Sequence, residues 1–451
     1  QAAPAAMEGG LKVPARHPID YSDLTFHDAE ALDVELRRVF DICHGCRRCF
    51  NLCDSFPRLF DLVDESDTGE LDSVDSADFK PVIDACTLCD MCFVATCPYV
   101  PPHEFALDFP HLILRARSTE LAAGRLGWAD KALAKTDRNG KLARPVAFVA
   151  NWASDRRNRL TRPVMQAVAG IHRDASLPRY QGKTFTMRAR RVPAVNAEAP
   201  AAGRKVAIFA TCFVNYNNPE IGEAARAVLA YNGVETVVAY PGCCGMPQLE
   251  QGDFASVAGK AKKTATALGD WLDKGYDIVV SVPSCALMLK LEWPLILPDD
   301  PAIKRLAAHA TDITEYVVDI AKTEGLADGL EPLDGGIAVH LACHARAQNM
   351  GSKAVEMLKL IPEADLEIIE RCSGHGGAWG VKKEFFEVAL KVGKPAARKA
   401  VRGEKAHLVS ECPLAGEHLR QGIEALGEAA LADQPTLHPI ELFARAYGLV
   451  S

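Results

Sequence analysis

Two groups of closely spaced cysteines near the start of the chain are the residues best suited to carry out chemistry. The groups are Cys43-x-x-Cys46-x-x-Cys49-x-x-x-Cys53 and Cys86-x-x-Cys89-x-x-Cys92-x-x-x-x-Cys97, the second followed by Pro98. A thiolate at every third residue lets a tight turn direct three sulfur atoms into one small volume. A fourth, more distant cysteine completes the ligand set of a [4Fe–4S] cluster. Because such clusters carry single electrons, the spacing predicts a redox protein.

Zinc is the alternative metal for these eight cysteines. Structural zinc sites usually combine paired C-x-x-C ligands, whereas each run here supplies three cysteines in succession. Fifteen cysteines in 451 residues is an odd number, and too few for a small scaffold held by disulfides. The clustered spacing suits metal binding in a reducing compartment, so we expect a cytoplasmic protein with two [4Fe–4S] clusters in this region.

Length and composition set broad limits on the protein. With 451 residues and 48% hydrophobic content, the chain is expected to divide into two or three domains. It contains no run of about 18 apolar residues, so we expect no transmembrane helix. Residues 1–10 lack the basic start and apolar core of a signal peptide. Because residue 1 is Gln, we expect a start that is processed or incompletely recorded, and Met7 is a candidate for a position near the true beginning. A formal charge of −8 argues against nucleic acid as the main partner.

The region that holds the two cysteine runs is predicted to be mainly helical. Residues 1–24 are expected to form an irregular arm because three prolines interrupt them. From 25 to 42 apolar residues recur at helical spacing, which predicts a helix that leads into Cys43. The acidic stretch 61–78 is interpreted as a solvated loop, with a docking patch for a basic partner as the alternative.

Residues 110–203 form a basic middle region. Its arginines include Arg144, Arg156, Arg157, Arg159, Arg162, Arg173, Arg179, Arg188, Arg190 and Arg191. Apolar residues such as Phe148 and Trp152 are interleaved with them, as in a basic amphipathic surface that rests on an anionic membrane or a partner subunit. The alternative is a helical arm that packs on its own protein and keeps its arginines in water. An Ala/Pro-rich linker is expected at 192–202.

Strand and helix patterns alternate from residue 204 onward and occur twice. The predicted strands are 206–210, 234–239 and 277–282 in the first half, and 337–341, 366–369 and 407–409 in the second. The predicted helices are 219–232, 252–273, 350–361 and 382–402. Because the two halves correspond element by element, the pattern predicts two similar α/β units with parallel sheets.

Seven further cysteines follow the predicted strands. They are Cys212, Cys243, Cys244, Cys285, Cys343, Cys372 and Cys412. Ligands of open parallel sheets bind at the carboxyl ends of strands, beside helix N-termini that stabilise thiolates and negatively charged clusters. A cysteine placed by chance is more often a small buried apolar residue. Seven cysteines at strand ends therefore favour a second redox site.

These patterns resemble a known family. Residues 204–450 are similar to the duplicated cysteine-rich (CCG) domain of heterodisulfide reductase, which also occurs in the iron–sulfur subunits of anaerobic glycerol-3-phosphate dehydrogenase and glycolate oxidase. Residues 25–108 are similar to their helical two-cluster ferredoxin domain. The resemblance implies a multidomain α+β protein with an arm (1–24), a helical two-cluster ferredoxin domain (25–109), a basic helical arm and linker (110–203) and two CCG α/β repeats with parallel sheets (204–330 and 331–451).

The resemblance also implies that the fourth cysteine of each run serves the other cluster. One cluster would then be bound by Cys43, Cys46, Cys49 and Cys97, and the other by Cys86, Cys89, Cys92 and Cys53. Two details depart from the usual pattern. Asp54, and not proline, follows Cys53, and four residues instead of three precede Cys97.

The family's CCG frame, Cys…Cys-Cys-Gly…Cys-x-x-Cys, is incomplete in both repeats. Met288 replaces the last cysteine of the first copy, while Ser373 and Ala415 replace two cysteines of the second. We expect Cys212, Cys243, Cys244 and Cys285 to bind one [4Fe–4S] cluster, cubane or non-cubane. The second copy would cap it or bind zinc through Cys343, Cys372 and Cys412. His344 and His375 are candidates for ligands, for hydrogen-bond donors to the ligands, or for substrate contacts.

Missing motifs narrow the function. The chain has no flavin or nicotinamide fingerprint and no phosphate-binding G-x-x-x-x-G-K-[ST] loop. Clusters without a two-electron site need a partner, so we predict an electron-transfer subunit that connects a flavoprotein dehydrogenase with quinone or another acceptor. If quinone is the acceptor, the basic arm would dock the protein on the cytoplasmic face of the membrane. The alternative is an enzyme that acts on a thiol/disulfide substrate, as heterodisulfide reductase does. A non-redox zinc scaffold is a third possibility.

Overall fold

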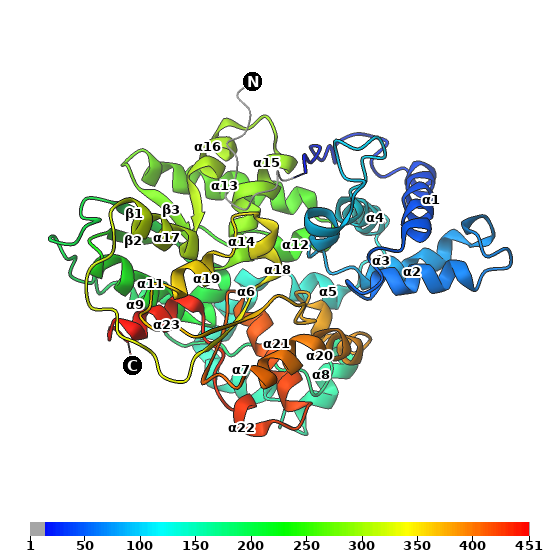
Figure 1. The fold of residues 1–451 in the computed structure, drawn as a ribbon. Helices are drawn as coiled ribbons and strands as arrows, with labels where there is room; N and C mark the ends of the chain where they lie inside the picture. The colour runs from blue at the N-terminus through cyan, green and yellow to red at the C-terminus, as the bar shows by residue number, and fades with distance from the viewer. Residues whose placement is uncertain (1–13, 451) are drawn as a thin grey trace.

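The computed structural model describes residues 14–450, a mixture of helices and two parallel sheets (Figure 1). Residues 1–13 of the predicted N-terminal arm lie outside the described residues. The helices that carry the two cysteine runs lie on one side of the molecule, and the strands of the first sheet lie on the other (Figure 1). Within the described range, no helix combines the length and apolar character that crossing a bilayer requires.

The cysteine-run region is helical, as predicted. Its helices are α1 (Ala29–Cys46), α2 (Ser55–Asp64), α3 (Lys80–Ala85) and α4 (Phe109–Ala122). Helix α1 begins later than the predicted 25–42 because the Asp28 side chain caps it, accepting from Ala31 N. It also continues further, through Cys46, and ends where Arg47 adopts a left-handed conformation with φ of 50°. Cys43 and Cys46 therefore lie one turn apart on the same helical face. The acidic stretch 61–78 is partly helical instead of a continuous loop.

The first parallel sheet has the strand order β2-β1-β3-β4. Its strands are β1 (Lys205–Phe209), β2 (Glu235–Ala239), β3 (Asp277–Val280) and β4 (Ala310–Asp312). Its helices are α10 (Cys212–Tyr216), α11 (Pro219–Tyr231), α12 (Met246–Leu249), α13 (Phe254–Leu272), α14 (Pro283–Leu287), α15 (Trp293–Ile296), α16 (Pro301–His309) and α17 (Ile313–Thr323). Central strand β1 is buried, as strands covered on both faces are.

The second parallel sheet has the order β6-β5-β7 and repeats the arrangement of β2-β1-β3. Its strands are β5 (Ile337–His340), β6 (Leu366–Ile369) and β7 (His407–Ser410). The helices that follow are α18 (Cys343–Ala347), α19 (Lys353–Leu358), α20 (Phe386–Gly403), α21 (Pro413–Glu424), α22 (Ala429–Ala432) and α23 (Pro439–Ala446). In register, Ala207 of β1 faces Val237 and Ile278, and Ala338 of β5 faces Glu367 and Leu408. The predicted parallel sheets are confirmed.

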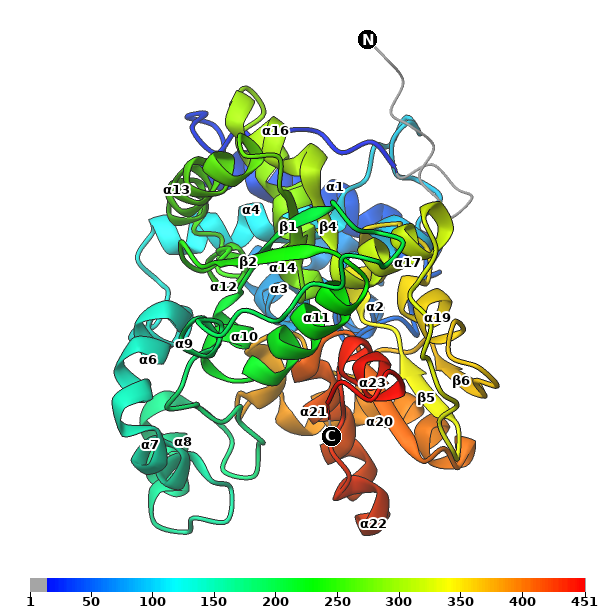
Figure 2. The same cartoon turned by 90° about the vertical axis from the view of Figure 1, so that its left-hand side faces the viewer.

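The basic middle region consists of short helices. They are α5 (Trp128–Leu133), α6 (Thr136–Ala143), α7 (Ala147–Ser154), α8 (Thr161–Ala169) and α9 (Phe185–Arg188). In Figure 2, α6, α7 and α8 project from the body beside the first sheet. Arg156 nevertheless pairs with Glu424 of α21, with nitrogen and oxygen 2.6 Å apart, so the segment is attached to the second repeat as well.

Two buried histidines make folding stability depend on pH. Burial lowers the pKa of His340 to about 4 and that of His438 to about 3. The usual pKa is about 6.5, so between these values the unfolded chain binds more protons than the native one. Stability should therefore fall as pH drops below 6.5, by about 1.4 kcal/mol per pH unit for each histidine that titrates.

Anaerobic urea unfolding at pH 7 and pH 5 measures this loss. His340 donates from Nε2 to the carbonyl of Arg371, 3.1 Å away, and its Nδ1 lies 2.9 Å from the Ser410 hydroxyl. A His340→Gln variant should lose less stability between the two pH values than the wild type does, because one proton-binding side chain is gone. Equal losses in both proteins would contradict the assignment.

Candidate metal centres

The thiols of the first cysteine run gather with Cys97 of the second run. Burial and the thiols of Cys97, Cys49 and Cys46 raise the pKa of Cys43 above its usual range. Burial, Cys97 and Cys46 likewise raise the pKa of Cys49 to about 12. Because the interaction between charges weakens with distance, these contributions indicate that the four thiols lie near one another.

The second gathering consists of Cys53 and the first three cysteines of the second run. Burial and the thiols of Cys89 and Cys86 raise the pKa of Cys53, and burial with Cys89, Cys86 and Cys53 raises that of Cys92. From Cys92 to Thr96 the backbone forms a π-type turn in which Cys97 N donates to Cys92 O at 2.8 Å. Such a turn contains one residue more than an α-turn, which accommodates the four residues between Cys92 and Cys97.

The four cysteines of the first repeat meet at the carboxyl ends of its strands. The sulfur atoms of Cys212 and Cys243 are 3.8 Å apart, and those of Cys244 and Cys285 are 3.2 Å apart. Hydrogen bonds from Cys212 and Cys244 lower the pKa of Cys243. Trp293 donates from Nε1 to Cys244 O at 3.1 Å, which fixes the backbone beneath this pair. Met288, at the missing family position, is fully buried.

Two residues of the middle region contact Cys243 of the first repeat, although no feature of the sequence indicates it. Thr136 Oγ1 donates to Cys243 Sγ at 3.3 Å, and Asp137 Oδ2 accepts from Cys243 N at 2.8 Å. Asp137 also accepts hydrogen bonds from the Tyr240 hydroxyl and from Lys260 Nζ, the latter at 3.3 Å. The start of α6 thus covers these thiols, more than 100 residues away along the chain.

The second repeat brings Cys343 and Cys372 beside Cys89 of the second cysteine run. Hydrogen bonding by Cys343 lowers the pKa of Cys372 to about 7 and also lowers that of Cys89. Cys412 instead lies near Cys285 of the first repeat; burial and that thiol raise the pKa of Cys412 to about 11. These placements join the second repeat both to the N-terminal region and to the first repeat.

The turns after Cys243 and Cys372 have the same construction. Gly245 N donates to Cys243 Sγ at 3.4 Å, and Gly374 N donates to Cys372 Sγ at 3.3 Å. Both glycines have positive φ, 93° and 78°. A Cβ on Gly374 would lie 2.0 Å from the carbonyl oxygen of Ala389, so this turn excludes any side chain there.

The two predicted histidines lie between the cysteine groups. His344 Nε2 is 3.1 Å from the carbonyl oxygen of Leu88, within the second cysteine run. Burial lowers the pKa of His375 to about 3, and the His418 ring lies 6.4 Å away between centroids. His344 therefore contacts the backbone of the second cysteine run, and His375, three residues after Cys372, is neutral at physiological pH.

The chemistry of the donor sets fits iron–sulfur clusters. Within residues 14–450, no three His, Cys, Asp or Glu side chains are positioned to bind a single metal ion together. In a [4Fe–4S] cluster the four cysteines hold a larger cage of iron and sulfide. Gatherings of four thiols, which shift one another's pKa in one direction or the other, supply the ligands that such a cage needs. The zinc considered for the second repeat stays a prediction.

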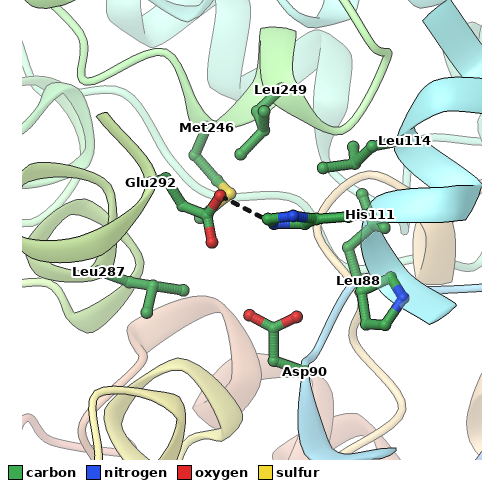
Figure 3. A pocket seen from close by; sticks show the side chains of 9 residues that line it. Leu88, Asp90, His111, Leu114, Met246, Leu249, Leu287 and Glu292 are labelled. Carbon is green, nitrogen blue, oxygen red and sulfur yellow. Dashed lines mark ion pairs between the residues drawn. The ribbon is translucent and has the colours of Figure 1, made fainter. Parts of the chain in front are cut away.

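A buried group of charges joins the second cysteine run to the first repeat. Arg16 pairs with Asp90 at 2.7 Å, with Asp108 at 2.9 Å and with Glu292 at 3.2 Å. His111 completes the group; its Nε2 lies 3.4 Å from Glu292 Oε2, the ion pair dashed in Figure 3. Burial alone would raise the pKa of Glu292, but His111 and Arg16 lower it to about 2. Apolar residues such as Leu88 and Met246 line the small cavity beside this group (Figure 3).

Several known proteins are similar to parts of this chain. Residues 206–290 match the family model of the cysteine-rich domain CCG. The chain is 26% identical over 317 residues to a subunit of anaerobic glycerol-3-phosphate dehydrogenase from Escherichia coli (strain K12), covering 70% of this chain and 76% of the relative. It is 26% identical over 251 residues to a subunit of fumarate reductase (CoM/CoB) from Methanothermobacter marburgensis, covering 54% and 47%. It is 31% identical over 191 residues to lactate utilization protein A of Geobacillus kaustophilus, covering 40% and 75%.

Proposed function

This chain belongs to the family of iron–sulfur proteins that carry the CCG cysteine-rich domain, and we propose that it is the electron-transfer subunit of a multi-subunit oxidoreductase. Two relatives are named as subunits of a dehydrogenase and of a reductase, which supports a role with a partner subunit. When bound, [4Fe–4S] clusters accept and release single electrons.

One observation carries the proposal: cysteine groups from different parts of the chain lie near one another. The first gathering, with Cys97, is followed by the second, whose Cys89 also contacts Cys343 of the second repeat. Cys412 then lies near Cys285, which is 3.2 Å from Cys244 in the first repeat. Such a series of neighbouring thiols suits stepwise electron transfer better than four unrelated metal sites would.

The proposal assigns the cysteines to clusters as the resemblance to the family implies. Residues 25–109 form the two-cluster ferredoxin domain, with Cys43, Cys46, Cys49 and Cys97 on one cluster and Cys53, Cys86, Cys89 and Cys92 on the other. The repeats 204–330 and 331–451 hold a further cluster through Cys212, Cys243, Cys244 and Cys285. The thiolates would coordinate the iron atoms of the clusters. Thr136 and the amide of Gly245 stabilise negative charge at Cys243 through hydrogen bonds.

The partners in the proposal are a flavoprotein dehydrogenase as electron donor and a quinone or another acceptor. The chain supplies no hydride-transferring cofactor motif, so substrate oxidation takes place on the partner. The alternative, chemistry on a thiol/disulfide substrate at the CCG site, differs in one requirement: the site must bind a small-molecule disulfide.

Metal analysis with electron paramagnetic resonance of anaerobically purified protein tests the proposal. About twelve irons with matching acid-labile sulfide, and signals that appear on reduction, support three clusters. About eight irons would restrict clusters to the ferredoxin domain, and zinc without sulfide would contradict the proposal. Reoxidation of the reduced protein by a water-soluble quinone, but not by a heterodisulfide, separates it from the thiol/disulfide alternative.

A further inference from the structure

Large apolar side chains gather on the outer surface of the middle region. Eight of the seventeen that are exposed among the described residues lie between 142 and 168. We call these eight the arm surface: Leu142, Val146, Phe148, Val149, Trp152, Leu160, Val164 and Val168. Phe148 is 86% exposed and Leu160 is 78% exposed. Single exposed apolar residues are ordinary, but a group of eight on three neighbouring helices and their connections marks an interaction site.

The arm surface is held rigidly by polar contacts on its inner side. The buried guanidinium of Arg162 donates to the carbonyl oxygens of Ser154, His172 and Ala175, which joins α7 to α8 and to the segment that follows. Asn151 exchanges two hydrogen bonds with the backbone of Tyr180, at 2.8 and 2.9 Å. The exposed apolar side chains therefore belong to a segment whose backbone is fixed by hydrogen bonds on its inner side.

The charge around the arm surface is predominantly positive. Between residues 138 and 173 the sequence contains eight Lys or Arg and a single acid, Asp155, in a chain whose net charge is −8. The carboxylate of Asp155 is engaged within the segment, since its Oδ1 accepts a hydrogen bond from Arg157 N at 2.8 Å. Lys141, Arg144, Arg157 and Arg159 are exposed beside the apolar residues. The rest of the molecule is correspondingly more acidic and would be repelled by an anionic surface.

We propose that the arm surface docks on an anionic lipid bilayer, with its apolar side chains at the boundary between headgroups and acyl chains and its cations on lipid phosphates. Aromatic and aliphatic residues flanked by arginines are the combination that places helices in the plane of a bilayer. Each cation near such a surface contributes to binding. A bilayer requires no shape-matched partner surface, and the arm surface projects from the body and is basic (Figure 2).

The docking site is connected directly to the first-repeat thiols. Helix α6 begins with Thr136 and Asp137, which contact Cys243, and carries Leu142 of the arm surface near its other end. Its eight residues span about 12 Å. Docking would thus bring the CCG site close to the membrane surface. This deepens the proposed function, on which it rests, because a membrane-soluble acceptor would be reached through this face.

Flotation with lipid vesicles tests the docking. The purified holoprotein should float with phosphatidylcholine vesicles that contain phosphatidylglycerol, should float much less with phosphatidylcholine alone, and should be released by high salt. A Phe148→Glu/Leu160→Glu variant should bind at least about tenfold more weakly. Leu24→Glu is the matched control, because Leu24 is 96% exposed but lies outside the arm surface.

Two further readouts make the outcome decisive. Brominated acyl chains should quench tryptophan fluorescence of the wild type, and quench it less in a Trp152→Phe variant. Vesicle binding that is equal in the Phe148→Glu/Leu160→Glu variant and the wild type, or absent in both, would overturn the docking proposal. Iron and sulfide content is measured on the same samples. Unchanged clusters with no vesicle binding refute the docking alone, whereas vesicle binding by protein without clusters refutes electron transfer alone.

Discussion

Replacing Cys97 by alanine is expected to abolish the cluster of the first cysteine run and to leave that of its own run in place. The thiols of Cys97, Cys49 and Cys46 all contribute to raising the pKa of Cys43. The fourth position of the second gathering is occupied by Cys53, which interacts with Cys89 and Cys86. A cage that loses one of four thiolates loses a ligand to one iron, so about four irons per chain should be lost or made labile.

Comparing pairs of variants shows whether the fourth ligands are exchanged between the two cysteine runs. If the fourth ligands are exchanged, Cys97→Ala should give the same electron paramagnetic resonance spectrum as Cys46→Ala, and Cys53→Ala the same as Cys92→Ala. If each run serves its own cluster, the spectrum of Cys97→Ala should instead match that of Cys92→Ala. Iron and sulfide contents of the four anaerobically purified variants provide the accompanying measurement.

Cys412→Ala serves as the control for general damage. Cys412 is partly buried and lies near Cys285 of the first repeat, so its loss should leave the spectra of the two N-terminal cysteine gatherings unchanged. Simultaneous loss of both clusters in Cys97→Ala, with Cys412→Ala intact, would contradict the exchange and indicate that the domain collapses as one unit.

Local periodicity explains why the sheets could be predicted from the sequence. The predicted strand 366–369 agrees with β6, and helix 219–232 agrees with α11 to within one residue. Buried parallel strands are short apolar runs that end at turn residues, and such runs are visible in a single sequence. Strand β4 has three residues and no such run, so no local pattern indicated it.

Contacts between distant segments explain what could not be predicted. The predicted first helix ended at residue 42, because a cysteine run was expected to lie in a turn, but the capping by Asp28 and the left-handed Arg47 determine its bounds. Nothing near Thr136 in the sequence indicates that it donates to Cys243, since only the tertiary fold brings α6 to that strand end. The same holds for the contact of Cys343 with Cys89.

Replacing Arg16 by methionine should cost about 3 kcal/mol or more in stability, because it leaves buried carboxylates without their main counter-charge. Arg16 pairs with Asp90 and Asp108 of the N-terminal region and with Glu292 of the first repeat, and its side chain is only 11% exposed. His111 is the other cation of the group, and it cannot compensate three acids. The sequence offers no indication of this role, since Arg16 and its three acidic partners lie far apart along the chain.

The Arg16→Met variant should also loosen the N-terminal region from the first repeat, because the guanidinium contacts both. Anaerobic urea unfolding, with cluster absorbance and far-ultraviolet circular dichroism followed together, should show a lower midpoint and a loss of coincidence between the two signals. Arg125→Met is the matched control, since the exposed Arg125–Glu120 pair should matter little. Adding Glu292→Gln to Arg16→Met should recover part of the stability, because it removes one uncompensated charge. If Arg16→Met behaves as Arg125→Met does, the buried charges do not hold the two regions together, and apolar packing alone must carry the junction between the cysteine runs and the repeats.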